Sequence, residues 1–362
     1  MIPVSQPFLP PKVEYESLIR ELWNTKWLTN NGIFVRKLEE KLKAYLQLSS
    51  LQFVNNGTIA LQLAIKSLGI NKEVITTPFS FVATTTSIIW EKCRPVFVDI
   101  DPKTLCIDPY KIEEAITEET EAILATHVYG IPCDVEKIEK IAKKHNLKVI
   151  YDAAHAFGVQ YKGKSLLSFG DVSTLSFHAT KLFHTVEGGA IITNSGVEFE
   201  QRIKLLRSFG FEGEQYILAG INGKNSEFHA AMGLCNLKYI DEIILKRKRI
   251  SEIYDRYLDN KFTRPYISKD VDYNYAYYPV IFETEEDLLI TQNKLSKNGI
   301  ESRRYFYPSL NKLPYLPDYY SCPISEDISS RILCLPLFSD LMHVEVERIS
   351  NLIMEKSRVE TI

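Results

Sequence analysis

The chain has 362 residues, of which 45% are hydrophobic and 25% are charged, and its formal net charge is −3. These values are ordinary for a globular protein, and the length is enough for one large domain and a smaller one. The one dense basic run, residues 245–249, is too short to favour nucleic acid as the main partner. No stretch approaches the about 18 apolar residues of a membrane span, and residues 1–12 lack the pattern of a signal peptide. We therefore expect a soluble, cytoplasmic protein that works without a membrane.

In chain order, residues 51–194 alternate short β-branched runs with amphipathic helices. Each apolar run is followed by a helical stretch of the length that a crossover connection needs. Such alternation predicts βαβ units around a mostly parallel mixed sheet with helices on both faces. The expected strands lie in LQFV, EVIT, RPVFVDID, EAILAT, KVIY, VSTLSF and GAIITN.

After residue 194 the pattern changes. A helix is expected in EFEQRIKLLRSFG, followed by a loop through Gly223 and one long helix that Asn225 or Ser226 can cap, with Glu227 in its first turn. Strand and helix stretches then follow in YYPVIF, EEDLLITQNKLSKNGI and HVEVERISNLIMEK. We expect a large α/β domain over residues 1–240 and a smaller α+β domain over residues 241–362.

The cysteine and histidine spacings predict neither a disulfide framework nor a metal site. His178 and His184 are six residues apart, with no carboxylate or thiol at ligand spacing. The cysteines contain no C-x-x-C pair, so reduced thiols and no bound metal are expected. They are Cys93, Cys106, Cys133, Cys235, Cys322 and Cys334.

Ligands of an open parallel sheet bind outside the carboxyl ends of its strands, so the residues that follow each strand are the candidates. The turn at residues 55–58, NNGT, offers backbone N–H groups at a helix N-terminus, which suits a phosphate; an ordinary capped turn is the alternative. Asp152 follows a strand expected to be buried and needs a partner, which a pyridinium nitrogen, an arginine or a helix N-terminus would provide. A structural role for Asp152 is the alternative.

Lys181 follows the strand in VSTLSF and precedes a Gly-Gly turn into the next strand. A lysine in so apolar a setting should have a lowered pKa, as Schiff-base chemistry requires; a lysine with its amine in water is the alternative. The phosphate seat, the carboxylate and the amine together match the three groups by which pyridoxal phosphate is held. Phe81, in the loop after another strand, can cover the cofactor ring, or can belong to the core.

These residues resemble the DegT/StrS family of fold-type I, pyridoxal-phosphate-dependent nucleotide-sugar aminotransferases. The resemblance covers nearly the whole chain. It is carried by WLTNNGIFVRKLEEKLKAYL, NNGTIALQLAI, TTPFSFVAT, VFVDIDPKTL, VYGIPCDVEKI, YDAAHAFG, SFHATK with EGGAI, INGKNSEFHAAMGL and CLPLFSDL.

The resemblance implies a role for each residue of the cofactor site. Lys181 is the Schiff-base lysine, and Asp152 pairs with the pyridine nitrogen. The amides of Gly57 and Thr58 hold the phosphate, together with the hydroxyl of Ser176.

Three further residues complete the set. Phe81 stacks on the ring, and His155 lies near the cofactor's 3-oxygen, where the family often has glutamine. Asn222 reaches the phosphate of the neighbouring subunit, although this chain reads NGK where many relatives have Asn, an aromatic residue and Arg. The family's active unit is accordingly a homodimer with active sites at the subunit interface.

Other stretches are implied to surround the substrate. Residues 27–32 and 303–308 are expected to line the sugar-nucleotide site. His178 is a candidate for the sugar or donor site, with packing inside its own loop as the alternative, and His184 is expected to be structural.

The lysine loop SFHATKLFHTVEGGA is similar to that of relatives that aminate C4 of the sugar. The resemblance implies transfer of an amino group from L-glutamate to a nucleotide-linked 4-keto-6-deoxy sugar, with dTDP-4-keto-6-deoxy-D-glucose as the expected substrate. The product would be a dTDP-4-amino-4,6-dideoxy sugar for bacterial surface glycans such as O-antigen. The alternatives are a C3-specific aminotransferase, a sugar dehydratase, in which histidine commonly replaces the lysine, and a non-catalytic regulator that binds the cofactor.

Overall fold

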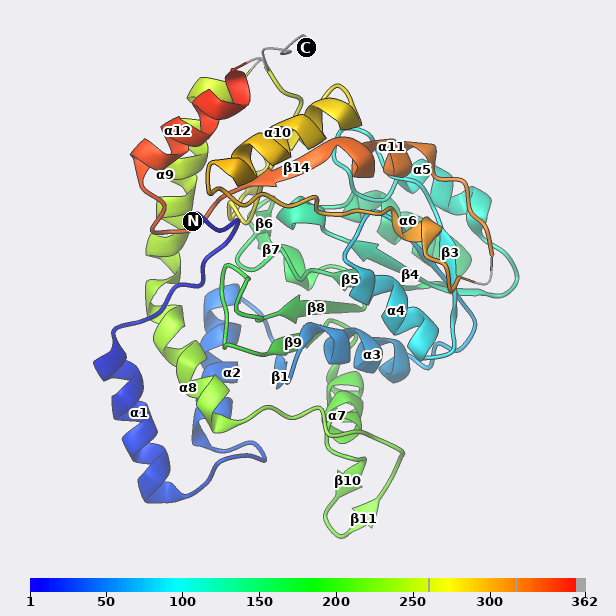
Figure 1. Ribbon diagram of the computed structural model, residues 1–362. Coiled ribbons are helices and arrows are strands. Elements are labelled where there is room, and N and C mark those ends of the chain that lie inside the picture. The colour runs from blue at the N-terminus through cyan, green and yellow to red at the C-terminus, as the bar shows by residue number, and fades with distance from the viewer. Residues whose placement is uncertain (260, 317, 356–362) are drawn as a thin grey trace.

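The computed structural model describes residues 1–259, 261–316 and 318–355, and its centre is one large sheet (Figure 1). The strand order is β1-β9-β8-β5-β4-β2-β3. Every neighbouring pair is parallel except those of β9, which is antiparallel to both β1 and β8. The predicted mostly parallel mixed sheet is therefore confirmed. Its strands are β1 Gln52–Val54, β2 Glu73–Thr76, β3 Arg94–Phe97, β4 Thr120–Thr126, β5 Lys148–Asp152, β8 Val172–Ser176 and β9 Gly189–Thr193.

Helices cover both faces of the sheet, because side chains of one strand point alternately to opposite faces. In β5, Val149 and Tyr151 belong to one apolar cluster, whereas Ile150 between them belongs to another. The first cluster includes side chains of α1 Lys12–Thr25, α2 Ile33–Leu46, α6 Val135–His145 and α8 Glu227–Asn236. The second includes side chains of α3 Gly57–Ser67, α4 Val82–Trp90 and α7 Val197–Leu206.

The long helix expected after Gly223 is present with one interruption. Ser226 caps α8, since its hydroxyl accepts the N–H of His229 at 3.5 Å. A 3-10 turn, η4 Leu237–Tyr239, then separates α8 from α9 Ile240–Leu258. The amphipathic pattern runs through this turn, so the sequence alone predicts a single helix.

A second, smaller core lies beside the C-terminal half of α9. It packs around the antiparallel pair β13 Tyr278–Ile281 and β14 Ile332–Leu335, with α10 Glu285–Lys297 and α12 His343–Met354 (Figure 1). The first residues of the chain join it, since the Ile2 N–H donates to the Gly299 carbonyl at 2.7 Å. A domain boundary between residues 240 and 241 stays a prediction.

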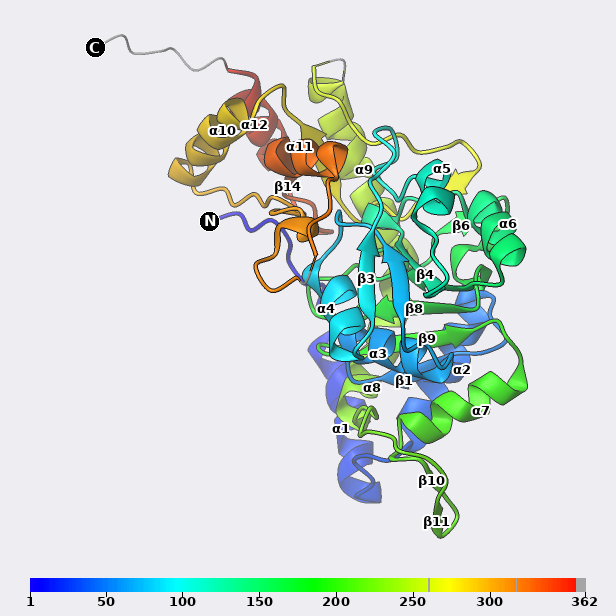
Figure 2. The same cartoon turned by 90° about the vertical axis from the view of Figure 1, so that its right-hand side faces the viewer.

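The remaining elements are short. The hairpin β10 Phe211–Glu212 and β11 Gln215–Tyr216 projects away from the sheet (Figures 1 and 2). No helix in the described part of the chain is long and apolar enough to cross a membrane. All six cysteines are buried free thiols. The other elements are α5 Pro109–Ile112, η1 Glu113–Ala115, η2 Val128–Gly130, β6 Gln160–Tyr161, β7 Lys164–Ser165, η3 Leu166–Ser168, β12 Val271–Asp272, η5 Leu310–Lys312 and α11 Pro323–Arg331.

Candidate active site

A cavity of about 500 Å³ opens at the carboxyl ends of β1, β2, β5 and β8. This is the edge of the sheet at which the sequence places the functional residues. All of the predicted cofactor residues except Asn222 line this cavity. Those that line it are Gly57, Thr58, Phe81, Asp152, His155, Ser176 and Lys181.

The turn after β1 leaves backbone donors free to bind an anion. The first N–H groups of a helix have no intrahelical acceptor, and the Asn56 side chain takes only that of Ile59, at 2.8 Å. The amides of Gly57 and Thr58 remain, at the positive end of α3. A Cβ on Gly57 would lie 2.9 Å from the Cβ of Ser176, so only glycine lets the turn approach β8 this closely.

Asp152, the last residue of β5, is buried, with 5% of its surface exposed. Its Oδ2 accepts the Thr84 hydroxyl at 2.7 Å, and its Oδ1 accepts the Ala154 N–H at 3.1 Å. Hydroxyl contacts continue from Thr84 to Ser80 at 2.7 Å and from Ser80 to Thr126 at 3.0 Å. Burial raises the pKa of the Asp152 carboxyl, while these donors and the Lys181 amine lower it. A cationic partner in the cavity would stabilise the ionised form.

Lys181 lies in the loop between β8 and β9, partly buried, with Nζ 3.4 Å from the Tyr277 hydroxyl. Burial lowers the pKa of its amine, while Asp152 and Tyr305 raise it. The alternative of a lysine with its amine in open water is therefore not what the structure shows. A neutral amine is the nucleophilic form, and the lowered pKa makes it more available near neutral pH.

Aromatic side chains enclose the space between these groups. His155 is 5% exposed, stacks on Phe306 with 5.6 Å between ring centroids, and accepts the Tyr129 N–H at Nδ1. Burial lowers the pKa of His155 well below its usual value, so its ring is neutral. Phe81 stands at the start of α4 with 49% of its surface exposed, and is not a core residue.

Asn222 and residues 27–32 do not line this cavity, nor does His184. Asn222 is exposed, and its carbonyl accepts the Asn55 side chain at 3.4 Å. His184 is buried, and one of its ring nitrogens lies 2.7 Å from the carbonyl oxygen of Phe8. The roles of Asn222 and of residues 27–32 thus stay predictions.

His178 lies at the mouth of the cavity. Its Nε2 is 3.6 Å from a carboxylate oxygen of Glu187, and both side chains line the cavity. Within the described ranges, no group of three or more His, Cys, Asp or Glu side chains could hold a metal ion.

The structure also adds residues that sequence reasoning missed. Thr84 carries the closest donor to Asp152, and Tyr277 carries the hydroxyl next to Lys181. Thr84 is the first of three consecutive threonines. Only the exact rotation of the helix decides which of the three faces the site, and the sequence does not give that rotation. Tyr277 directly precedes β13. A tyrosine next to the end of a strand is a signal by which the sequence could have indicated a site residue. Of the predicted stretch 303–308, Arg303, Tyr305 and Phe306 do line the cavity.

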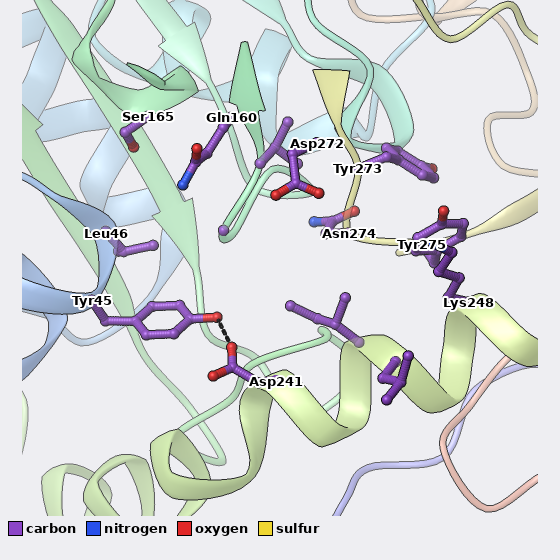
Figure 3. A pocket seen from close by; sticks show the side chains of 14 residues that line it. Tyr45, Leu46, Gln160, Ser165, Asp241, Lys248, Asp272, Tyr273, Asn274 and Tyr275 are labelled. Atoms are coloured by element: carbon purple, nitrogen blue, oxygen red, sulfur yellow. Dashed lines mark hydrogen bonds between the residues drawn. The ribbon is translucent and has the colours of Figure 1, made fainter. Parts of the chain in front are cut away.

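A second cavity, of about 360 Å³, lies between α2, α9 and the segment after β12 (Figure 3). The Tyr45 hydroxyl donates to Asp241 at 2.6 Å, Asp272 faces them from the opposite side, and Tyr275 lines the edge of the cavity near Lys248. Its lining shares no residue with the cavity that holds Lys181.

Comparisons with known proteins agree with this site. Residues 12–354 match the DegT/DnrJ/EryC1/StrS aminotransferase family. Two relatives named dTDP-4-amino-4,6-dideoxy-D-glucose transaminase are 45% identical, from Shigella dysenteriae, and 42% identical, from Escherichia coli. The alignments cover 97% and 98% of this chain, and 98% of each relative.

The fold agrees as well. The solved structure of DesI in the presence of its TDP-sugar product superposes with a TM-score of 0.91 at 30% identity, covering 97% of this chain and 92% of that one. The family resemblance of the sequence motifs is thereby confirmed, and so is the fold-type I architecture. The chain belongs to the DegT/DnrJ/EryC1/StrS aminotransferase family.

Proposed function

We propose that the protein is a pyridoxal-phosphate-dependent aminotransferase that moves an amino group from L-glutamate to C4 of a nucleotide-linked 4-keto-6-deoxy sugar. One observation carries the proposal: the Lys181 amine and the Asp152 carboxylate share a cavity with the free amides at the start of α3. An amine alone, or an anion seat alone, would fit many kinds of ligand.

The residues present fit the cofactor. Two backbone amides and the Ser176 hydroxyl at one end suit a phosphate, and the absence of a Cβ on Gly57 lets its backbone lie close to Ser176. Asp152, buried and held by Thr84, suits a ring nitrogen that carries a proton. Lys181 offers an amine to an aldehyde.

Each of these residues has a distinct chemical task. When bound, pyridoxal phosphate supplies an aldehyde and an electron-withdrawing ring that stabilises negative charge on the carbon next to the transferred nitrogen. Asp152 keeps a proton on the ring nitrogen, and Thr84 orients the carboxylate for it. The Lys181 amine, once free and neutral, would move a proton from the α-carbon of glutamate to the reactive carbon of the cofactor, and in the second half of the cycle from that carbon to C4 of the sugar. Phe81 and Phe306 line the same space and offer apolar rings that can cover the cofactor.

The sugar assignment rests on the two transaminase relatives, whose printed names specify a 4-amino-4,6-dideoxy-D-glucose linked to dTDP. Their identity of 42% to 45% over nearly the full length supports the same substrate, dTDP-4-keto-6-deoxy-D-glucose, for this chain. Lys181 disfavours the dehydratase alternative, because a free lysine amine permits transamination to proceed.

We also propose that the protein acts as a cytoplasmic homodimer in which each subunit completes the site of the other. Asn222 is exposed at the base of the β10–β11 hairpin, where it could reach a neighbouring subunit. The hairpin itself exposes Phe211 and Tyr216, at 49% and 76%. Exposed aromatic side chains on a projecting element are typical of subunit contacts.

A substrate panel tests the proposal. The purified protein is loaded with pyridoxal phosphate and given L-glutamate with dTDP-, UDP- or GDP-linked sugars that carry a keto group at C3 or C4. We expect turnover of the dTDP-linked 4-keto-6-deoxy sugar, with an amino group at C4 of the product by NMR. Turnover of 3-keto sugars alone contradicts the C4 assignment, and cofactor binding without any turnover favours the regulator.

A further inference from the structure

Among the residues that the structure describes, Tyr277 alone makes a side-chain hydrogen bond with the Lys181 amine. Nζ donates to the Tyr277 hydroxyl oxygen at 3.4 Å, and both side chains line the same cavity. Burial raises the pKa of the Tyr277 phenol, so its hydroxyl stays protonated near neutral pH. It can therefore accept a hydrogen bond from the charged amine and donate one to the neutral amine.

The ring of Tyr277 is fixed by aromatic neighbours. It meets His155 edge-on with 5.0 Å between centroids, Tyr305 edge-on with 5.6 Å, and Tyr129 at 5.5 Å. Contacts on several sides leave little rotational freedom to the side chain. The hydroxyl is accordingly held at one place beside the amine.

The backbone that carries Tyr277 is held by a buried arginine. Arg247 of α9 donates from Nε to the Tyr275 carbonyl at 2.9 Å and from Nη2 to the Ala276 carbonyl at 2.6 Å. Among the described ion pairs Arg247 has no carboxylate partner, and burial lowers its pKa to about 10. Burying a guanidinium without a counter-ion is costly. The segment that Arg247 anchors leads directly into Tyr277, so this costly contact fixes the backbone position of Tyr277.

The same segment is tied to the loop that follows Asp152. The Asn274 side chain donates to the carbonyls of His155 and Phe157, both at 2.9 Å, and accepts the Ala276 N–H at 3.1 Å. Figure 3 shows Asn274 and Tyr275 beside the second cavity. Tyr277 instead lines the cavity of Lys181, so the segment crosses between the two.

We propose that Tyr277 is a positioning residue, whose hydroxyl holds the free Lys181 amine in the position from which it moves protons. The effect on proton transfer rests on the proposed aminotransferase function. The contact with Nζ does not depend on that function and can be tested separately.

The first test uses the protein without cofactor. The rate of acetylation of Lys181 is followed by mass spectrometry of the Lys181 peptide as a function of pH, since only the neutral amine reacts. The hydroxyl stabilises the charged amine more than the neutral amine, because hydrogen bonds to an ionised group are the stronger ones, so its loss lowers the pKa of Lys181. In Tyr277→Phe we expect the labelling midpoint to move to lower pH by about one unit. Tyr275→Phe, on the same segment, is the matched control and should keep the wild-type midpoint.

The second test uses the cofactor-loaded enzyme with its amino donor and ketosugar. Tyr277→Phe should lower kcat by about tenfold with little change in either KM, because the hydroxyl contacts the amine rather than the substrates. An unchanged labelling midpoint, or a shift equal to that of Tyr275→Phe, overturns the proposal, and so does an unchanged kcat. If the wild-type enzyme aminates no sugar, the proposed function fails, while the midpoint still decides whether Tyr277 holds the amine. Tyr277→Met repeats both tests should the phenylalanine variant fold poorly.

Discussion

Burial favours the neutral form of both Lys181 and Asp152. Burial lowers the pKa of the amine and raises that of the carboxyl, while each charge counteracts the shift of the other. A cavity that contains such a pair has a charge state that a ligand can set. A ring nitrogen beside Asp152 and an aldehyde beside Lys181 would each satisfy one member of the pair.

Replacing Lys181 tests the amine directly. Lys181→Ala should abolish turnover, because no other lysine of the described ranges lines the cavity. Reduction with borohydride in the presence of pyridoxal phosphate should attach the cofactor covalently to Lys181 in the wild type, and mass spectrometry should find no such adduct in the variant. Lys164→Ala, at an exposed lysine, serves as the control. Full activity of Lys181→Ala would falsify the mechanism.

Replacing Asp152 tests the charge next to the ring nitrogen. Asp152→Asn keeps the shape and an acceptor for Thr84 but removes the anion, so kcat should fall by about 10- to 100-fold. Asp270→Asn, at an exposed aspartate, should leave kcat unchanged. Thermal unfolding of both variants shows whether either is misfolded. Near wild-type turnover of folded Asp152→Asn means that the pyridinium assignment is wrong.

At the scale of the element, the start of α3 carries the backbone amides that we propose for the phosphate. In Gly57→Ala the added methyl group meets the Ser176 Cβ at 2.9 Å, which forces α3 and β8 apart. We expect the affinity for pyridoxal phosphate to fall by about tenfold or more, measured by equilibrium titration. Ser67→Ala, at the opposite end of α3, changes the same helix without touching the turn and should bind like the wild type. Equal affinities of the two variants would place the phosphate elsewhere.

The start of α2 depends on a buried carboxylate. Glu227, 1% exposed, accepts the N–H of Phe34 at 2.6 Å and that of Val35 at 3.3 Å. Burial raises the pKa of Glu227, while these N–H donors lower it. Since the folded pKa is the higher one, this residue favours folding most below its unfolded pKa of about 4, and that contribution is lost as the pH rises through the folded pKa.

Glu227→Gln removes this titration and keeps an acceptor for one N–H. The free energy of unfolding of the variant minus that of the wild type should therefore become more positive as the pH rises from about 4 toward neutral. Urea unfolding at a series of pH values measures it. Glu40→Gln, at an exposed position of α2, should show a flat difference. A flat difference for Glu227→Gln as well would mean that its pKa is not raised.

The sheet and two of the site residues are predictable from the sequence, whereas the break in the long helix is not. Strand and helix alternation identifies the sheet, and the rule that ligands sit at the carboxyl ends of strands leads to Asp152 and Lys181, because both depend on local pattern. The turn η4 within the long helix is not predictable, since the apolar face continues through it. Thr84 and Tyr277 approach the site from α4 and from the segment before β13, and such contacts arise only from tertiary packing.

At the scale of the whole molecule, the homodimer that we propose would bring Asn222 into the site of the neighbouring subunit. Asn222→Ala should weaken cofactor binding, and Lys181→Ala should be inactive. If each site takes its lysine from one chain and its asparagine from the other, a mixed dimer has one intact site. Beyond the residual activity of the Asn222→Ala dimers, coexpression of the two variants should then restore about a quarter of the wild-type activity.

Two controls make this mixing experiment decisive. Lys181→Ala coexpressed with itself should stay inactive, and light scattering should show a dimer for every sample. No recovery in mixed dimers contradicts a shared site, and a monomeric wild type contradicts the assembly itself.

The burial of all six thiols has a practical consequence. Thiol reagents react with exposed sulfur, so the native chain should be nearly silent to them, and each of its cysteines reports an opening event of its own region. A single cysteine introduced on the β10–β11 hairpin would then be the one fast-reacting position. It would accept a fluorophore or a spin label without removal of any natural cysteine. In the proposed homodimer, two such labels would report the distance between the two hairpins.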